Sequence, residues 1–128
     1  MNTVVKKLLP RSWRTEAMHK KYEQERTETV LDGTCPLCST PTHLEFKYWR
    51  IVENTYPYDA VASKHHMLLT KRHLSSDRDL TKEETDELIE LKESVLDELY
   101  TFIMEALPRN KSIPGHYHLH LIVPKVVT

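Results

Sequence analysis

The sequence has little glycine, little net charge and no long apolar segment. Only 2 of its 128 residues are glycine, so it has no glycine-rich loop of the kind that cradles a triphosphate. The formal net charge is -1, which gives no sign of a nucleic-acid-binding surface. No apolar run approaches the roughly 20 residues that cross a bilayer, and the apolar stretch before Pro10 is too short for a signal peptide. We therefore expect a cytoplasmic protein with neither a membrane nor a nucleic acid as a partner.

Cysteine and histidine are present but unevenly placed. Both cysteines lie in one motif, Cys35-Pro36-Leu37-Cys38, which we call the cysteine knuckle. Five of the 8 histidines fall in two short segments, residues 65–66 and 116–120. In a reducing compartment, a Cys-x2-Cys pair indicates a metal site or a redox pair more than a structural disulfide. The clustered histidines are the main clue to function.

Two helical segments are expected. Residues 13–30 are densely charged with a weak apolar stripe, which indicates a helix or an arm. A long helix is expected over residues 81–107, where apolar side chains recur every three or four positions. Thr81 and Glu84 have the spacing of a capping box at its start, and Pro108 marks its end.

The remaining pattern predicts strands. Residues 42–53 indicate one long strand or a tight pair, residues 65–70 a second strand, and residues 116–124 the last one. Strands separated by one helix favour an α+β fold with a mainly antiparallel sheet of four to five strands. We expect residues 1–32 to form an N-terminal arm, partly helical, and residues 33–128 to form the compact domain.

Three histidines alternate with apolar residues on the last strand. Because side chains two apart share a face, His116, His118 and His120 form a column while the residues between them face the core. The outer two start about 13 Å apart, which strains a single metal bound by all three. The column instead favours a middle histidine that attacks a phosphate beside one that donates to its oxygens. A reactive metal on His116 and His118, completed by His65 or a carboxylate, is the alternative.

The motif HYHLHLI, residues 116–122, resembles the His-φ-His-φ-His-φ-φ signature (φ apolar) of the histidine-triad (HIT) superfamily. Residues 54–57, residues 65–73 and the helix that opens near Thr81 resemble the family's order of ribose loop, histidine-bearing strand, basic turn and helix. The resemblance covers most of residues 33–124. It implies a nucleotide-binding hydrolase or nucleotidyltransferase that acts on the α-phosphate of a nucleoside-phosphate substrate through a nucleotidyl-histidine intermediate.

The resemblance also implies roles by motif position. His118 corresponds to the nucleophile, His120 would bind phosphate oxygen, and His65 would lie beside the phosphate. Asn54 would approach the ribose hydroxyls. The loop before the triad lacks the Gly-Gln-Ser type of sequence that many hydrolases of the family use around the leaving group. The polar substitutes there, expected to bind nucleotide with Asn54, are Asn110 and Ser112. The family often forms homodimers, so a homodimer is expected as well.

The cysteine knuckle suits one tetrahedral zinc and needs two further ligands. A redox role is less favoured because no thioredoxin-like strand-then-helix context follows the motif. His73 and His116 are the candidate ligands, and His43 is a competitor close to the knuckle. In the zinc-bearing branch of the superfamily, which includes galactose-1-phosphate uridylyltransferases, the knuckle is completed by a histidine after the second strand and by the first triad histidine. His73 and His116 hold those places, and a closed Cys2His2 shell predicts a structural zinc.

A third function remains open beside the nucleotidyl enzyme and the metal-dependent hydrolase. The chain would then be a zinc-stabilised nucleotide-binding module that has lost turnover. Such a module would still gain thermal stability from a bound nucleotide, without forming product.

Overall fold

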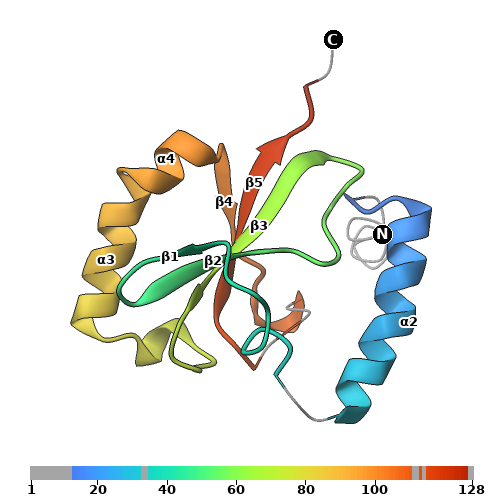
Figure 1. Cartoon of the computed structure of the whole chain (residues 1–128), viewed down its shortest axis with the longest axis horizontal. Coiled ribbons are helices and arrows are strands. Elements are labelled where there is room, and N and C mark those ends of the chain that lie inside the picture. The colour runs from blue at the N-terminus through green and yellow to red at the C-terminus, as the bar shows by residue number, and fades with distance from the viewer. Residues whose placement is uncertain (1–12, 33–34, 111–112, 114, 127–128) are drawn as a thin grey trace.

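The computed structural model describes residues 13–32, 35–110, 113 and 115–126. They form one antiparallel sheet with helices on both sides (Figure 1). Helices α3 (Lys82–Lys92) and α4 (Val95–Leu99) lie on one side of the sheet, and α2 (Glu16–Asp32) lies on the other. The predicted α+β class and the helical N-terminal arm are confirmed. No helix of the described residues is long and apolar enough to span a membrane.

The sheet has five strands in the order β1-β2-β3-β5-β4, and every neighbouring pair is antiparallel. The predicted strand over residues 42–53 is a tight pair, because β1 turns directly into β2. Strands β3 and β5 lie at the centre, where the sequence places its histidines. The strands are β1 (Leu44–Glu45), β2 (Trp49–Glu53), β3 (Ala62–Thr70), β4 (Phe102–Met104) and β5 (His118–Pro124).

The long helix expected over residues 81–107 is present as α3 and α4, with a break at residues 93–94, and the expectation is wrong beyond residue 99. The predicted capping box is present, since the Thr81 side chain and the Glu84 backbone and side chain bond reciprocally. The helix breaks near Ser94, whose hydroxyl donates to the Glu90 carbonyl at 2.8 Å and competes with the helical hydrogen bonds. Residues 102–104 then form edge strand β4 along β5. Aromatic and β-branched side chains fit this edge, although their spacing also fits a helix.

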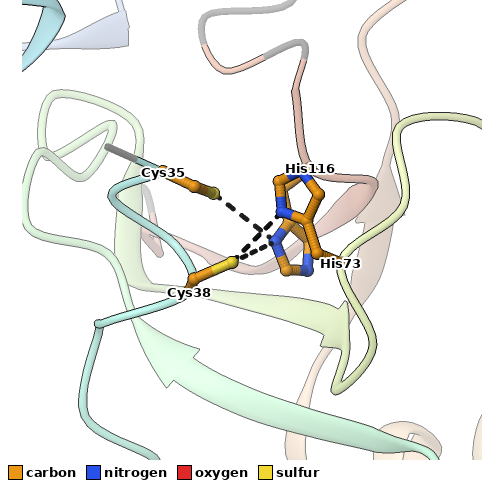
Figure 2. A group of neighbouring side chains, drawn as sticks. All are labelled: Cys35, Cys38, His73 and His116. Carbon is orange, nitrogen blue, oxygen red and sulfur yellow. Dashed lines mark hydrogen bonds between the residues drawn. The ribbon is translucent and has the colours of Figure 1, made fainter. Parts of the chain in front are cut away.

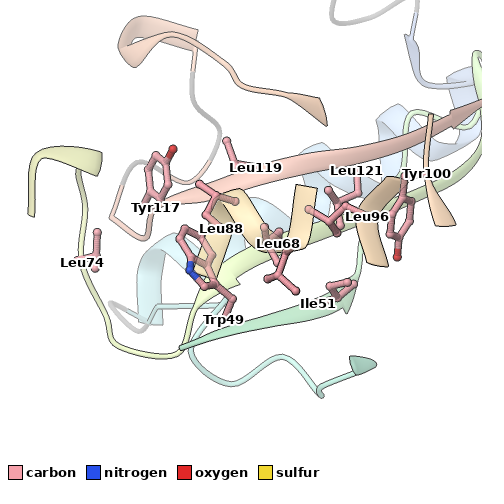
Figure 3. Packing of buried hydrophobic residues seen from close by; sticks show 11 residues of the cluster. Trp49, Ile51, Leu68, Leu74, Leu88, Leu96, Tyr100, Tyr117, Leu119 and Leu121 are labelled. Carbon is pink, nitrogen blue, oxygen red and sulfur yellow. The ribbon is translucent and has the colours of Figure 1, made fainter. Parts of the chain in front are cut away.

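The main core fills the space between the sheet and helices α3 and α4 (Figure 3). Tyr117, Leu119 and Leu121 point into this core, as predicted for the residues between the histidines. Trp49 is fully buried, and its indole nitrogen donates to the Glu84 carbonyl at 2.8 Å, which joins β2 to α3. Each large side chain buried here contributes about 1.5–3 kcal/mol. This packing fixes the register of β5 and turns His118 and His120, together with His116 just before the strand, away from this core.

The opposite face carries a smaller apolar cluster. Val52, Met67 and Leu69 project from the sheet and contact Leu37 of the cysteine knuckle. In the register of β3 with β5, Met67 lies opposite His120 and Leu69 opposite His118. The knuckle and the histidines therefore share one face, away from the main core.

Candidate active site and metal centre

The four predicted metal ligands meet at one point (Figure 2). Their ligand atoms all lie within 4.8 Å of one another. The Cys38 Sγ lies 3.1 Å from His73 Nδ1 and 3.4 Å from His116 Nδ1, and the Cys35 Sγ lies 3.6 Å from His116 Nδ1. Tetrahedral bonds of about 2.0–2.3 Å place the ligand atoms about 3.3–3.8 Å apart. Two thiols and two imidazoles at this spacing fit one tetrahedral metal ion.

The orientation of His116 supports this reading. Its Nε2 donates to the Thr70 carbonyl at 3.0 Å, which puts the lone pair on Nδ1, the atom that faces the cysteines. Burial lowers the pKa of His116 and so favours the neutral ring that binds a metal. His43, the competing ligand, is not in the group, and its ring packs against that of His66 at 4.9 Å between centroids. A backbone carbonyl that orients a ligating imidazole is typical of metal sites.

Arg50 holds the cysteine knuckle against the sheet. This β2 side chain is buried and donates to the carbonyl oxygens of Leu37 and Thr40 and to the Thr42 hydroxyl. These are charge-assisted hydrogen bonds, which are the stronger ones. The loop that carries both cysteines is therefore tied directly to β2.

His118 is held by the same part of the backbone. Its Nδ1 donates to the His116 carbonyl at 2.9 Å, so the ring carries its lone pair on Nε2. The side chain is only 5% exposed. Because the His116 ring faces the cysteines while its carbonyl orients His118, a single residue joins the candidate metal group to the middle histidine.

His65 and His120 form a second hydrogen-bonded pair on this face. The Tyr58 N–H donates to His65 Nδ1 at 2.9 Å, which leaves the His65 proton on Nε2. That Nε2 lies 2.8 Å from His120 Nδ1 and donates to it, so His120 in turn carries its proton on Nε2. The rings of His118 and His120 are 5.1 Å apart between centroids. His118 thus presents a lone pair on Nε2, and the neighbouring His120 presents an N–H on its Nε2.

Both members of this pair are neutral at physiological pH. Burial is the main reason that the pKa of His65 and that of His120 fall to about 3. Neighbouring imidazoles lower these pKa values further, His120 acting on His65 and His118 acting on His120. A neutral His120 is a hydrogen-bond donor without being a general acid.

These pKa shifts predict a loss of stability in mild acid. Both histidines have a pKa lowered from 6.5 to about 3, so below pH 6.5 the unfolded chain binds more protons than the folded one. Their contribution is complete above pH 6.5 and is lost as the pH falls towards 3. We expect the free energy of unfolding to fall by about 2–4 kcal/mol between pH 7 and pH 5, measured by urea denaturation. His120→Asn should weaken this dependence, and an unchanged slope in that variant would contradict the assignment.

We call residues 54–60 the ribose loop, after the role predicted for residues 54–57, and they close the other side of His65. Asn54 accepts a hydrogen bond from the Tyr56 N–H at 2.8 Å, and its amide nitrogen lies 3.2 Å from His65 Nε2. The structure thus brings Asn54 beside the histidines. Of the other predicted nucleotide contacts, Asn110 lies in the short helix η2 (Pro108–Asn110), where only its backbone is described. Ser112 lies outside the described residues.

The basic turn after β3 supplies structural ion pairs. Lys71 contacts Glu45 at 2.7 Å, and Arg72 contacts the buried Glu84 at 2.9 Å. Sequence reasoning missed a different cation, Arg14 of the N-terminal arm, which is buried against Tyr58 of the ribose loop. The charged sequence around Arg14 gave no sign of this contact.

Comparison with known proteins places the fold. No protein-family model and no curated protein matches the sequence. A HIT family hydrolase from Clostridium thermocellum aligns with a TM-score of 0.52 at 16% identity, covering 73% of this chain and 97% of its own. A histidine triad protein from Clostridium difficile aligns with a TM-score of 0.51 at 19% identity, covering 73% of this chain and 93% of its own. A HIT family hydrolase from Legionella pneumophila aligns with a TM-score of 0.50 at 16% identity, covering 74% of this chain and 96% of its own. The chain has the histidine-triad fold, as the sequence motif implied.

Proposed function

We propose that this chain, which has the histidine-triad fold, is a nucleotide hydrolase or nucleotidyltransferase with His118 as its nucleophile. The observation that carries the proposal is the arrangement of the two rings on β5. His118 has its lone pair on Nε2, and His120, 5.1 Å away between ring centroids, has an N–H to donate. An oriented nucleophile beside a fixed hydrogen-bond donor suits displacement at phosphorus. Two of the similar solved structures are named HIT family hydrolases, which supports this reaction class.

The reaction proceeds in two displacements at the α-phosphorus. His118 Nε2 forms a bond to phosphorus while the bond to the leaving group breaks, and the leaving group departs with that electron pair. His120 Nε2–H donates to a phosphoryl oxygen as charge builds up there. Water, or an acceptor hydroxyl in a transferase, then attacks the phosphorus and releases a proton to solvent. The electron pair of the P–N bond returns to His118, and its Nδ1–H stays bound to the His116 carbonyl throughout.

We propose further that Asn54 binds the ribose hydroxyls, and that Asn110 and Ser112 lie near the leaving group. Asn54 of the ribose loop is well placed for this role because its amide nitrogen lies 3.2 Å from Nε2 of His65 on β3, beside the other histidines of the site. Replacing Asn54 should raise KM more than it lowers kcat, because a ribose contact made equally in the ground and transition states contributes uniform binding.

Zinc is the metal that we propose for the group of Cys35, Cys38, His73 and His116. Two thiolates and two imidazoles are a common structural zinc set, and four protein ligands leave no position for a substrate or a water. When bound, the ion would neutralise the thiolates and link the cysteine knuckle to His116, just before β5. His116 then holds its carbonyl towards His118.

The proposed function is tested by turnover of a nucleotide panel containing nucleoside phosphoramidates, dinucleoside polyphosphates and nucleotide sugars. The zinc-loaded full chain is expected to release a nucleoside monophosphate, or to transfer the nucleotidyl group to an added acceptor. Thermal stabilisation by nucleotides without any product would assign the chain to the inactive binding module instead. Activity that disappears at once with a chelator while the fold persists would favour the metal-dependent hydrolase.

We also propose that the chain forms a homodimer through the edge strand β4. Phe102, which is 59% exposed, and Leu107, which is 72% exposed, leave an apolar surface beside an open strand edge. Phe102→Glu is expected to yield a monomer in sedimentation experiments while the wild type sediments as a dimer. Val126→Glu, at an exposed position beyond β5, is the control that should stay dimeric. A monomeric wild type would contradict the proposal.

A further inference from the structure

The N-terminal arm is fastened to the ribose loop at several points. The Thr15 N–H and hydroxyl donate to the Asp59 carboxylate at 2.8 and 2.9 Å. The Ala60 N–H donates to the Trp13 carbonyl at 2.9 Å, and the Trp13 ring packs edge-on against Tyr58 at 5.2 Å between centroids. Residues 13–15 therefore have a defined position relative to this loop.

Arg14 lies at the centre of these contacts. Its Nε donates to the Tyr56 carbonyl at 2.9 Å, and its guanidinium carbon lies 4.1 Å from the ring centroid of Tyr22 and 4.9 Å from that of Tyr58. The side chain is only 9% exposed. Removing a guanidinium from water is costly, and stacking on two aromatic rings offsets part of that cost. A planar, stacked donor of this kind fixes the two tyrosines to which it binds.

Tyr58 connects Arg14 to the histidines. The Tyr58 ring contacts the Arg14 guanidinium. The same ring lies 4.4 Å from the His65 ring and 5.5 Å from the His120 ring, measured between centroids. The backbone N–H of the same residue is the group that donates to His65 Nδ1. A shift of Tyr58 would therefore change the hydrogen bond that sets the His65 tautomer.

We propose that Arg14 is a positioning residue that sets the tautomers of His65 and His120 by holding the ribose loop in place. The inference rests on the proposed function, because the tautomer of His120 matters through the phosphate that this ring would bind. With Tyr58 in place, His65 carries its proton on Nε2 and donates to His120 Nδ1, so the Nε2 of His120 is a donor. The arm thereby takes part in the catalytic arrangement without touching the substrate.

Loss of Arg14 is expected to reverse the direction of the hydrogen bond between His65 and His120. Once the Tyr58 N–H moves away, the His65 proton can lie on Nδ1, which leaves a lone pair on Nε2 facing His120. His120 then donates from Nδ1, and its own Nε2 becomes a lone pair directed at the phosphate oxygen. Each ring exchanges one proton with solvent, and no net charge changes. A hydrogen-bond donor becomes a repulsive acceptor at the atom where the transition state gains charge.

The experiment compares ¹⁵N-histidine spectra of the zinc-loaded full chain in the wild type, Arg14→Ala and Arg14→Lys. Long-range ¹H–¹⁵N correlations identify which nitrogen of each ring is protonated. The wild type is expected to show the Nε2–H form of both His65 and His120, and Arg14→Ala to populate the Nδ1–H form of both. The kcat of Arg14→Ala should fall about 10- to 100-fold, with a smaller change in KM. Lys20→Ala removes an exposed arm charge and should match the wild type in both measurements.

Arg14→Lys distinguishes position from charge. Lysine keeps the positive charge but lacks the planar stacking group and the Nε donor. In Arg14→Lys the tautomers of His65 and His120 should therefore shift as they do in Arg14→Ala. Complete recovery of the wild-type spectrum by lysine would overturn the proposal, as would unchanged Nε2–H forms in a folded Arg14→Ala. If Arg14→Ala does not fold, Thr15→Val, which loosens the arm at Asp59, takes its place. This variant should shift the His65 and His120 tautomers in the same direction, and wild-type tautomers in Thr15→Val would overturn the proposal. A wild type that turns over no nucleotide refutes the proposed function, while the spectra still decide the role of Arg14.

Discussion

His118→Ala is expected to lower kcat about 10³- to 10⁶-fold on the best substrate of the nucleotide panel, because the covalent step loses its nucleophile. The fold should persist, since His118 belongs neither to the main core nor to the metal group. Zinc content should equal that of the wild type for the same reason. The check is steady-state turnover beside metal analysis of both samples.

His43→Ala is the matched control for this substitution. His43 is exposed, packs on His66 and lies outside the metal group, so its loss should change neither kcat nor zinc content. Near-normal turnover by His118→Ala would show that another group attacks phosphorus. A loss of zinc in His43→Ala would restore it as a metal ligand in place of His73 or His116.

Cys38→Ser is expected to lose the metal and to lower the Tm by about 10–20 °C. A structural metal contributes binding free energy to folding, and its loss should cost several kcal/mol of the roughly 5–15 kcal/mol that stabilise a domain of this size. Turnover should fall as well, because His116, which we propose as a metal ligand, also holds His118 through its carbonyl. Calorimetry with zinc analysis makes the measurement, and chelation of the wild type should reproduce the result.

Ser39→Ala provides the control within the same loop. Among the described residues its hydroxyl hydrogen-bonds to the Pro36 carbonyl alone, at 3.4 Å, so both metal content and Tm should stay close to the wild type. A Cys38→Ser protein that keeps its metal and its Tm would show that the knuckle does not hold a structural ion.

The histidine strand could be predicted because its signal is local. Alternation along residues 116–121 placed the histidines on one face and Tyr117, Leu119 and Leu121 on the other, and the structure confirms that division. The capping box at Thr81 is likewise complete within four residues. The group of knuckle cysteines, His73 and His116 joins distant segments, but the family resemblance supplied that pairing.

Two features could not be predicted, and the physical reasons differ. Strand β4 follows two short helices whose apolar spacing continues into it, so periodicity alone extended the helix through residues 102–104. Residues 102–104 form a strand because they pair with the open edge of β5, and a single sequence does not show that such an edge is available. The docking of Arg14 was missed because this residue, just before helix α2, contacts two tyrosines through its guanidinium while Thr15 bonds to a carboxylate, and such contacts produce no apolar period.

Trapping of the covalent intermediate tests the central claim most directly. The zinc-loaded protein is mixed with its best nucleotide substrate, quenched in alkali to preserve a phosphoramidate bond, digested and mapped by mass spectrometry. The account predicts a nucleotidyl adduct on the peptide that contains β5, located at His118 and absent from His118→Ala. Turnover without an adduct, or with the adduct on another residue, would contradict it.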